Sequence, residues 1–574
     1  MTGSYPSWPF LAGVLAVLAG LPVVFGDTYS LYIGSLVAIY TIAGFGVAIL
    51  AGCCREISIG HSFFFAIGAY AYTLSSQPAG PGEWIGLVAA LVLGTVGGLA
   101  FGLLSHRLTG PQFTLATLCL AIIAEQVSVE WKSVTGGFGG LSVSHRPKVM
   151  DWQLNPMVLY LAASVLAAAS CLAFRNLQRS AWGRAFCSLG DAPLALASLG
   201  HSRLKVLAAA LALSGAITAL AGWFFAPVAK FVSPDALTPQ LALGFLLVAL
   251  LGGRRHPCGP LLGAIVVVGL PECLAFIPNS KLLVFACALL AVVYFLPGGI
   301  ADLLMPFKRV TKAVPAPPPG DLVTPNRGRD LEVRNLSVHF DGVSALDQVN
   351  ATFRAGTISF LVGPNGAGKT TLVNAIDGNV AGESGAILLG AMPFSTRTSL
   401  RSGQDKLART FQQPQLFDSL SPVENVLVAM ITLRWMSLPM ALFGSQPSAD
   451  QVRSAAEFLA TFGYRGDLNA EISAIPFGSL RAIELARAVA LRPAVLLLDE
   501  PSSGVDGQEL TELIGSLRRI RSLGVTTIVV THDARMIQET ADHIIILEEG
   551  KITYSGHLEG SALHDHVYIP SSTA

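Results

Sequence analysis

Ten runs of apolar residues occupy the first half of the chain, and they limit its fold more than any other feature. The runs lie near residues 9–26, 30–52, 59–76, 84–104, 112–129, 157–174, 206–228, 240–253, 258–276 and 282–298. A helix needs about 20 apolar residues to cross a membrane. The run at 240–253 is short, so it either crosses the membrane or re-enters it. The pattern predicts a multi-span α-helical membrane domain.

Composition agrees with this prediction. Of the 574 residues, 52% are hydrophobic and 13% are charged, whereas about 25% are charged in an ordinary soluble domain. A chain of this length predicts two large domains. The formal net charge is zero, so bulk electrostatics favour no nucleic-acid partner. Membrane lipid is the partner that the apolar half predicts.

Basic residues indicate how the spans are oriented. If ten spans alternate from a cytoplasmic N-terminus, the inner loops hold twelve basic residues and the outer loops five. The positive-inside rule then places the second half of the chain in the cytoplasm. The run at 9–26 lacks a basic start and a clear cleavage site, which favours a retained helix over a cleaved signal peptide.

Cysteines are confined to the apolar half and lack metal-ligand spacing. We predict that all eight are small buried hydrophobes. They are Cys53, Cys54, Cys119, Cys171, Cys187, Cys258, Cys273 and Cys287.

A proline-rich stretch separates the two halves. Residues 312–320 read Lys-Ala-Val-Pro-Ala-Pro-Pro-Pro-Gly, which is typical of an extended spacer rather than of a core. We therefore predict a membrane domain at 1–305, a linker at 306–330 and a soluble α/β domain at 331–574.

A glycine-rich loop at 363–371 is the first candidate functional motif in the second half of the chain. It follows a strand-like apolar run at 358–362 and precedes a helix-like segment, the order that is typical of a phosphate-binding loop. Its glycines let backbone N–H groups point at phosphate oxygens, and the helix N-terminus adds partial positive charge. Lys369 would reach the β- and γ-phosphates, and Thr370 would ligate Mg²⁺. The predicted nucleotide-binding residues are Gly363, Pro364, Asn365, Gly366, Ala367, Gly368, Lys369, Thr370 and Thr371.

Five further residues could complete this site. Asp499 and Glu500 end a buried strand-like run, where the first suits a Mg²⁺ contact and the second suits polarisation of the attacking water. His532 could contact the γ-phosphate, Gln412 could bind Mg²⁺ and the water, and Phe340 could stack on adenine. Taken singly, these last three fit ordinary structural roles better. Their order along the chain favours the site.

In that order the residues resemble the ATP-binding cassette (ABC) family over about 331–560. The matches are Phe340 with the A-loop, 363–371 with Walker A, Gln412 with the Q-loop, Asp499 and Glu500 with Walker B, Gly504, Val505 and Asp506 with the D-loop, and His532 with the switch histidine. The resemblance implies ATP and Mg²⁺ as cofactors. It also implies catalysis by Glu500, His532 and Gln412, and metal ligation by Thr370, Gln412 and Asp499. The fold class becomes a multi-span α-helical membrane domain followed by an α/β P-loop ATP-binding cassette domain.

The signature motif departs from the family pattern. The usual Leu-Ser-Gly-Gly-Gln falls on Ile-Pro-Phe-Gly-Ser at 475–479, which leaves Gly478 and Ser479 as the signature contacts. In this family the signature of one cassette closes over the Walker A of its partner, so the departure concerns the partner's nucleotide. The proline and the aromatic residue, with an insert at 431–470, resemble the cassettes of branched-chain amino acid importers.

The apolar half resembles the second permease subunit of the same importers over about 30–275. Residues 56–70 resemble its "SLGHAAFFGIGAY" block, and 134–141 resemble its "TGGxxGL" loop. Residues 179–200 match its coupling segment, which implies a short helix seated on a cassette, although a charged cluster is replaced by Gly-Asp-Ala-Pro at 190–193. His61 and Glu125 are candidate substrate ligands. Alternatively, His61 shapes a re-entrant turn and Glu125 lies where water reaches.

The resemblance implies a fused permease–ATPase subunit in a bacterial inner membrane, with its ATPase domain in the cytoplasm. It would import a small polar solute, with branched-chain or related amino acids ahead of amides or urea. Implied partners are a second permease subunit, a second cassette and a periplasmic solute-binding protein. An exporter would have fewer and longer spans. A non-transporting ATP-binding membrane regulator is the other alternative: the altered signature favours it, whereas the intact Glu500 and His532 oppose it.

Overall fold

The structure is a computed structural model that describes most of the chain. The described residues are 13, 28–78, 80–143, 145–149, 152–274, 281–296, 298–304, 328–340, 343–380, 382, 384–394 and 407–557. The predicted span at 9–26, apart from one residue, and most of the predicted linker at 306–330 lie outside them.

The chain divides into two compact units that exchange segments. The membrane unit comprises residues 1–190, 202–310 and 433–446, and the nucleotide unit comprises 191–201, 311–432 and 447–574. The sequence predicted consecutive domains, because composition changes only once along the chain. Each unit instead receives a short segment from the other half of the sequence.

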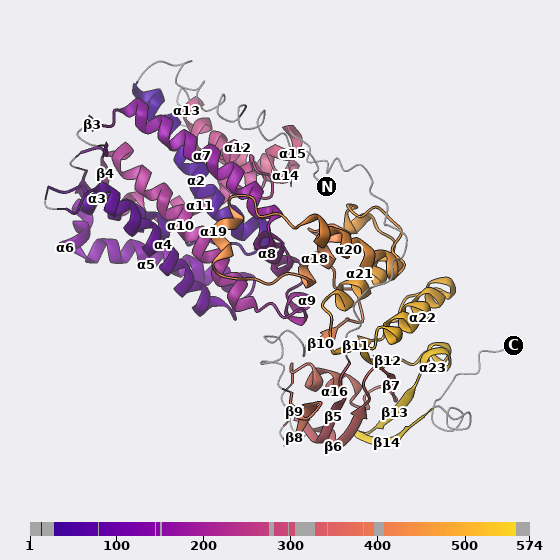
Figure 1. Ribbon diagram of the computed structural model, residues 1–574. Coiled ribbons are helices and arrows are strands. Elements are labelled where there is room, and N and C mark those ends of the chain that lie inside the picture. Colours follow the sequence, from indigo (N-terminus) through magenta and orange to yellow (C-terminus); the bar gives the residue numbers. More distant parts are fainter. Residues whose placement is uncertain are drawn as a thin grey trace. The chain divides into compact units, whose positions relative to one another are not determined.

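The membrane unit is built from helices (Figure 1). They are α2 (Thr28–Ala48), which continues into the π-helix η1 (Ile49–Cys54), α3 (His61–Ser75), α4 (Glu83–Ser105), α5 (Pro111–Glu130), α6 (Lys132–Thr135), α7 (Pro156–Arg179), α8 (Ala181–Asp191), α10 (Arg203–Ala229), α11 (Pro239–Gly252), α12 (Gly259–Ala264), α13 (Leu270–Cys273), α14 (Lys281–Phe295), α15 (Ile300–Leu304) and α19 (Ser437–Ala441).

Six helical segments of the described chain are long and apolar enough to cross a membrane. They are Thr28–Cys54, Glu83–Ser105, Pro111–Glu130, Pro156–Arg179, Arg203–Ala229 and Pro234–Gly252. The last segment contains the short apolar run at 240–253. A 3₁₀ turn at its start extends it to 19 residues, which is long enough to cross a membrane. The runs at 59–76, 258–276 and 282–298 form the shorter α3, α12–α13 and α14.

Glycines let the central helices of the membrane unit approach closely. A Cβ atom on Gly68 of α3 would lie 1.8 Å from the carbonyl oxygen of Ala219 in α10. One on Gly222 of α10 would lie 2.0 Å from the carbonyl oxygen of Phe65 in α3. Small residues at helix contacts are typical of membrane proteins, because packing rather than water drives the helices together. The pair α3–α10 therefore requires glycine on both sides.

The prediction that all eight cysteines are buried is wrong for three of them. Cys119, Cys273 and Cys287 are exposed, and Cys187 is half-buried. The exposed three lie on α5, α13 and α14, on faces that the described protein does not cover. A membrane supplies an apolar environment without protein burial, so a small hydrophobe is tolerated on such a face.

Two sheets form the frame of the nucleotide unit. The larger has the order β10-β11-β12-β7-β13-β14, in which only the edge strand β14 is antiparallel to its neighbour, and the smaller is antiparallel with the order β6-β5-β8-β9. The strands are β5 (Leu331–Phe340), β6 (Val343–Phe353), β7 (Ile358–Val362), β8 (Ser384–Leu389), β9 (Met392–Pro393), β10 (Leu407–Arg409), β11 (Val495–Asp499), β12 (Thr526–Val530), β13 (His543–Glu548) and β14 (Lys551–Gly556).

Helices flank these sheets in the same unit. They are α9 (Pro193–Ser198), α16 (Lys369–Ile376), α18 (Pro422–Ala429), α20 (Ala449–Thr461), α21 (Phe477–Ala490), α22 (Gly507–Ser522) and α23 (Ala534–Thr540). The apolar core joins both sheets to α16, with Leu336, Leu361, Leu372 and Leu497 all buried. This core fixes the helix that follows the glycine loop.

Candidate nucleotide-binding site

Four parallel strands end where the predicted site residues begin. The glycine loop follows β7, Gln412 follows β10, Asp499 ends β11, and His532 follows β12. In the register of the sheet Asp499 pairs with Val530, and Val530 pairs with Leu361. Because parallel strands end at one edge of the sheet, these residues gather there.

The loop before α16 has the backbone that its glycines predict. Gly366 and Gly368 have φ of 85° and 100°, in the left-handed region. A Cβ atom on Gly368 would also lie 2.5 Å from the carbonyl oxygen of Ala345, so only glycine fits there. The Lys369 ammonium donates to the carbonyl oxygens of Gly363 and Pro364, each at 2.8 Å. Burial lowers the pKa of Lys369, and the carboxylates of Glu500 and Asp499 oppose that shift.

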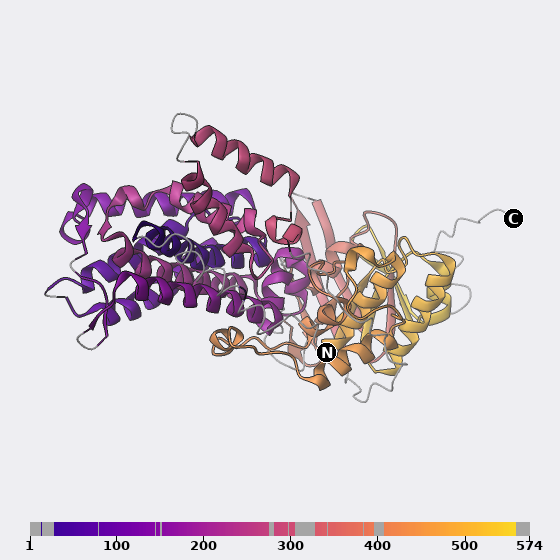
Figure 2. The ribbon, with the colours of Figure 1, turned by 90° about the horizontal axis from the view of Figure 1, so that it is seen from above.

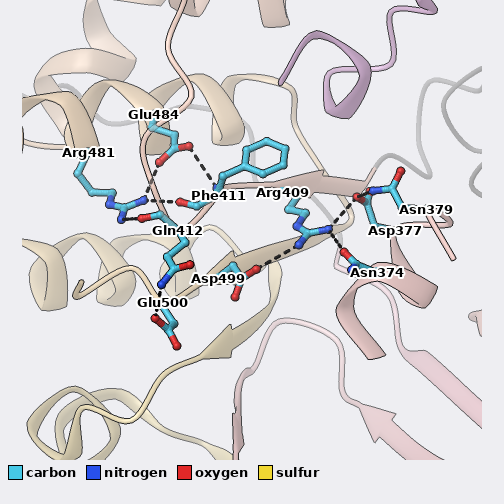
Figure 3. Close-up of polar contacts among 10 residues, drawn as sticks. All are labelled: Asn374, Asp377, Asn379, Arg409, Phe411, Gln412, Arg481, Glu484, Asp499 and Glu500. Carbon is cyan, nitrogen blue, oxygen red and sulfur yellow. Dashed lines mark hydrogen bonds and ion pairs between the residues drawn. The ribbon is translucent and has the colours of Figure 1, made fainter. Parts of the chain in front are cut away.

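Arg409 connects the acid at the end of β11 to the helix of the glycine loop (Figure 3). Its guanidinium donates to Asp499 at 3.1 Å, to Asp377 at 3.2 Å and to Asn374 at 2.7 Å. Burial raises the pKa of Asp377, and Arg409 opposes that shift. Sequence reasoning missed Arg409. A charged residue in an otherwise apolar strand-like run, directly before the Q-loop, was the available signal.

Gln412 and Glu500 meet through their side chains. The amide Nε2 of Gln412 donates to Oε2 of Glu500 at 2.9 Å (Figure 3). Glu500 has a left-handed φ of 43°, and its backbone N–H donates to the carbonyl of Val530 at 2.8 Å. The carboxylate is thereby held at the sheet edge beside an amide. This pair can accept a proton from a water molecule and orient that water.

A buried ion pair on α21 holds the Q-loop backbone. Arg481 donates to the carbonyls of Phe411 and Gln412, both at 2.7 Å, and to Glu484 at 2.9 Å. Glu484 in turn accepts the backbone N–H groups of Phe411 at 3.3 Å and Gln415 at 3.4 Å. Burial raises the pKa of Glu484, and Arg481 and Arg487 oppose that shift. No sequence motif predicted that Arg481 and Glu484 hold the Q-loop backbone.

The remaining predicted residues lie outside this network of described contacts. His532 is exposed directly after β12, and Phe340 ends β5 with 48% of its surface exposed. Gly478 and Ser479 lie in the first turn of α21 after the N-cap Pro476. A Cβ atom on Gly478 would lie 1.9 Å from the carboxylate of Glu509. The one signature glycine that this sequence keeps thus packs against the end of the Glu509 side chain on α22, which would have to move to admit a larger residue.

Residues 191–200 of the predicted coupling segment belong to the nucleotide unit, and residues 179–190 belong to the membrane unit. Asp191 accepts both the backbone N–H and the hydroxyl of Ser419, each at 2.7 Å. His201 contacts the carbonyl of Val428 in α18 through Nε2 at 3.2 Å. Between these anchors, α9 packs against β10, the strand that leads to the Q-loop. The Gly-Asp-Ala-Pro sequence thus replaces the family's charged cluster with one carboxylate that has two partners.

The two candidate substrate ligands of the membrane unit, His61 and Glu125, differ in burial. His61 is fully buried, and its ring nitrogens contact the hydroxyls of Ser214 at 2.7 Å and Ser58 at 3.2 Å. The Ser214 hydroxyl donates a hydrogen bond to the carbonyl of Gly46 at 2.7 Å. Both ring nitrogens are engaged, which favours the structural alternative for His61. Glu125 is half-buried on α5.

Together, the glycine loop, the strand-end acids and the Q-loop on a parallel sheet define an ATP-binding cassette. Residues 346–503 match the family model described as "ABC transporter", and residues 29–294 match "Branched-chain amino acid transport system / permease component". The chain belongs to the ABC transporters of the branched-chain amino acid importer family, with permease and cassette fused.

Curated relatives support this assignment for the cassette. BraF, a high-affinity branched-chain amino acid transport ATP-binding protein of Pseudomonas aeruginosa, is 30% identical over 225 residues, which are 38% of this chain and 88% of BraF. LivG of Escherichia coli, with the same description, is 31% identical over 229 residues, which are 38% of this chain and 88% of LivG. The galactofuranose transporter ATP-binding protein YtfR of Escherichia coli is 30% identical over 220 residues, 38% of this chain but 42% of YtfR.

The family and the fold establish the general activity. The chain is the permease and ATPase of an ABC importer, and it couples ATP hydrolysis to transport. It is a multi-pass inner-membrane protein whose ATPase domain is cytoplasmic.

Proposed function

We propose that the imported solute is a branched-chain or related amino acid. The proposal rests on the permease match at 29–294, because the permease half is the part that passes the solute. The sugar-transporter relatives are ATP-binding proteins by name, so they resemble the cassette of this chain rather than its permease half. Amides and urea are the alternative cargoes.

The site residues have the following proposed roles in ATP turnover. Thr370, Gln412 and Asp499 supply oxygen donors, which Mg²⁺ prefers, and the ion would neutralise phosphate charge. Glu500 polarises the attacking water, with Gln412 and His532 orienting water and γ-phosphate. Lys369 and the backbone of 363–371 bind the phosphates, and Phe340 stacks on adenine. Gly478 and Ser479 face the nucleotide of a partner cassette.

The proposed assembly needs further subunits. ABC importers use two permease domains and two cassettes, and we propose a second permease subunit, a second cassette and a periplasmic solute-binding protein as partners. We also propose that residues 306–330 link a membrane domain at 1–305 to a cassette at 331–574, apart from the two exchanged segments.

Uptake by the reconstituted complex tests the cargo. Proteoliposomes that hold this chain with the subunits encoded beside its gene should accumulate labelled leucine or isoleucine with ATP inside, at least about tenfold faster than urea, acetamide or ribose. Lys369→Ala is the matched control, because it removes the phosphate ligand and should abolish uptake of every solute. Faster uptake of urea or acetamide would show that urea or an amide, rather than an amino acid, is the imported solute. ATP binding with neither hydrolysis nor uptake of any solute would instead support the non-transporting regulator.

The contact between Asp191 and Ser419 predicts a coupling defect. Asp191→Ala should lower uptake about tenfold while ATP hydrolysis by the complex persists, because each hydrogen bond to a charged group contributes roughly 1.5–3 kcal/mol. Asp191→Asn keeps an acceptor oxygen and should have an intermediate effect, and Ser419→Ala removes the hydroxyl partner only. Uptake and hydrolysis are measured on the same proteoliposomes. An equal fall of both in Asp191→Ala would mean that the contact supports folding rather than coupling.

A further inference from the structure

Residues 433–446, here called the insert segment, leave the cassette sequence and join the membrane unit. The segment reads Leu-Arg-Trp-Met-Ser-Leu-Pro-Met-Ala-Leu-Phe-Gly-Ser-Gln and carries one charged residue, Arg434. Backbone hydrogen bonds from residues 434–443 extend the helical turns of α19 on both sides. Such an apolar composition is unusual for an insertion in a soluble ATPase.

The inner face of the insert segment is anchored on membrane-unit helices. Leu438 and Ala441 are buried. The indole N–H of Trp182 in α8 donates to the hydroxyl of Ser437 at 3.1 Å, and the rings of Trp182 and Trp435 lie 5.8 Å apart. In Figures 1 and 2 the segment, in orange, lies beside the indigo-to-magenta helices of its unit.

The ends of the insert segment are tied to two membrane-crossing helices. Asn176 of α7 donates to the carbonyl of Leu442 at 3.0 Å, and Lys205 of α10 donates to the carbonyl of Leu433. The backbone of the segment is therefore fixed at the ends of α7 and α10.

The outer face of the insert segment is apolar and uncovered. Met436, Met440 and Phe443 are 89%, 66% and 87% exposed. Their spacing of four and three residues places them on one face of a helix. An exposed apolar stripe of this kind marks an interaction site.

The depth of the insert segment follows from α7. Asn176 lies 20 residues after Pro156, the first residue of that helix, which corresponds to about 30 Å at the rise of an α-helix. The hydrocarbon core of a bilayer is about as thick. The chain continues from both ends of the segment into the cytoplasmic ATPase, so the contacted end of α7 is its cytoplasmic end. The segment thus lies level with the inner surface of the membrane.

We propose that the insert segment is an interfacial membrane anchor. Met436, Met440 and Phe443 contact acyl chains at the boundary between headgroups and hydrocarbon in the cytoplasmic leaflet, as interfacial helices do. Trp435 fits this level, where tryptophan is enriched, and Arg434 is suited to anionic headgroups. The anchor keeps part of the cassette sequence on the membrane at every stage of ATP turnover.

Oxidation of the native chain in lipid nanodiscs tests the proposal without any substitution. A polar oxidant that does not enter the bilayer should convert Met436 and Met440 to sulfoxide at least about fivefold more slowly than Met392. Met392 is the matched control, because it is 57% exposed on β9 of the nucleotide unit. Oxidation of Met436 and Met440 as fast as that of Met392 would overturn the proposal.

Lipid labelling distinguishes a bilayer from a covering protein. A photoreactive diazirine on the lipid acyl chain should label the peptide of residues 433–446, with the peptide of α5 as positive control because Leu115 and Ile123 are exposed there. Replacement of Met436, Met440 and Phe443 by serine should lower labelling of the first peptide about fivefold and leave the second unchanged. Slow oxidation without lipid labelling would show that protein covers the stripe and would overturn the proposal.

Discussion

Glu500→Gln should lower ATP hydrolysis by the assembled importer by at least about a hundredfold. A positioned general base contributes roughly 10²–10⁴-fold, and an amide cannot take the proton of the attacking water. The Gln412 amide, 2.9 Å from Glu500 in the native chain, can still bond to a glutamine oxygen. The site should therefore keep its shape and retain ATP. Steady-state phosphate release and retention of labelled ATP after gel filtration measure the two effects.

Glu512→Gln is the matched control, because Glu512 is an exposed glutamate on α22 of the same unit. It should hydrolyse ATP at the native rate. An unchanged rate of ATP hydrolysis in Glu500→Gln would show that Glu500 is not a catalytic residue. Comparison with the same change in a partner cassette also tests the altered signature: if that partner has a complete signature, the loss from Glu500→Gln should be the larger one.

Arg481→Met should lower the free energy of unfolding of the nucleotide unit by about 3–5 kcal/mol, because loss of one partner leaves a buried charge uncompensated. Glu484 loses its ion-pair partner, and the carbonyls of Phe411 and Gln412 lose their donor. Urea unfolding of the full chain in detergent, followed by pulse proteolysis of the nucleotide unit, measures the loss. Arg453→Met breaks an exposed ion pair with Asp450 and should change stability by less than about 1 kcal/mol.

The defect of Arg481→Met should also depend on pH. Burial already raises the pKa of Glu484, and removal of Arg481 raises it further. At Glu484 the folded variant then binds more protons than the unfolded chain, so the contribution of this group to stability is fully present below its unfolded pKa and is lost as pH rises through its folded pKa. Equal losses from Arg481→Met and Arg453→Met at neutral pH would mean that the buried pair does not hold the Q-loop.

The sequence predicted the parts of the ATP site that depend on neighbouring residues. The glycine loop and the Asp499–Glu500 pair follow from local order, because a strand end and a helix start fix their backbone. Arg409, Arg481 and Glu484 were missed because their partners on other elements are tens of residues away, and only the packed fold brings them together. The three exposed cysteines were misassigned because hydrophobicity does not tell a lipid-facing position from a protein core.

The exchange of segments has a consequence for biogenesis. The membrane unit includes residues 433–446, so it cannot be complete until the ribosome has passed residue 446, nearly halfway through the cassette sequence at 331–574. The membrane spans must therefore enter the bilayer before residues 433–446 are synthesised. The nucleotide unit has no such delay, because residues 191–201 are synthesised before the rest of that unit. In a chimera that joins this permease to another cassette at the proline-rich linker, the membrane unit would lack residues 433–446. Residues 191–201 would be left without the cassette that they belong to. A functional chimera would have to carry both segments along.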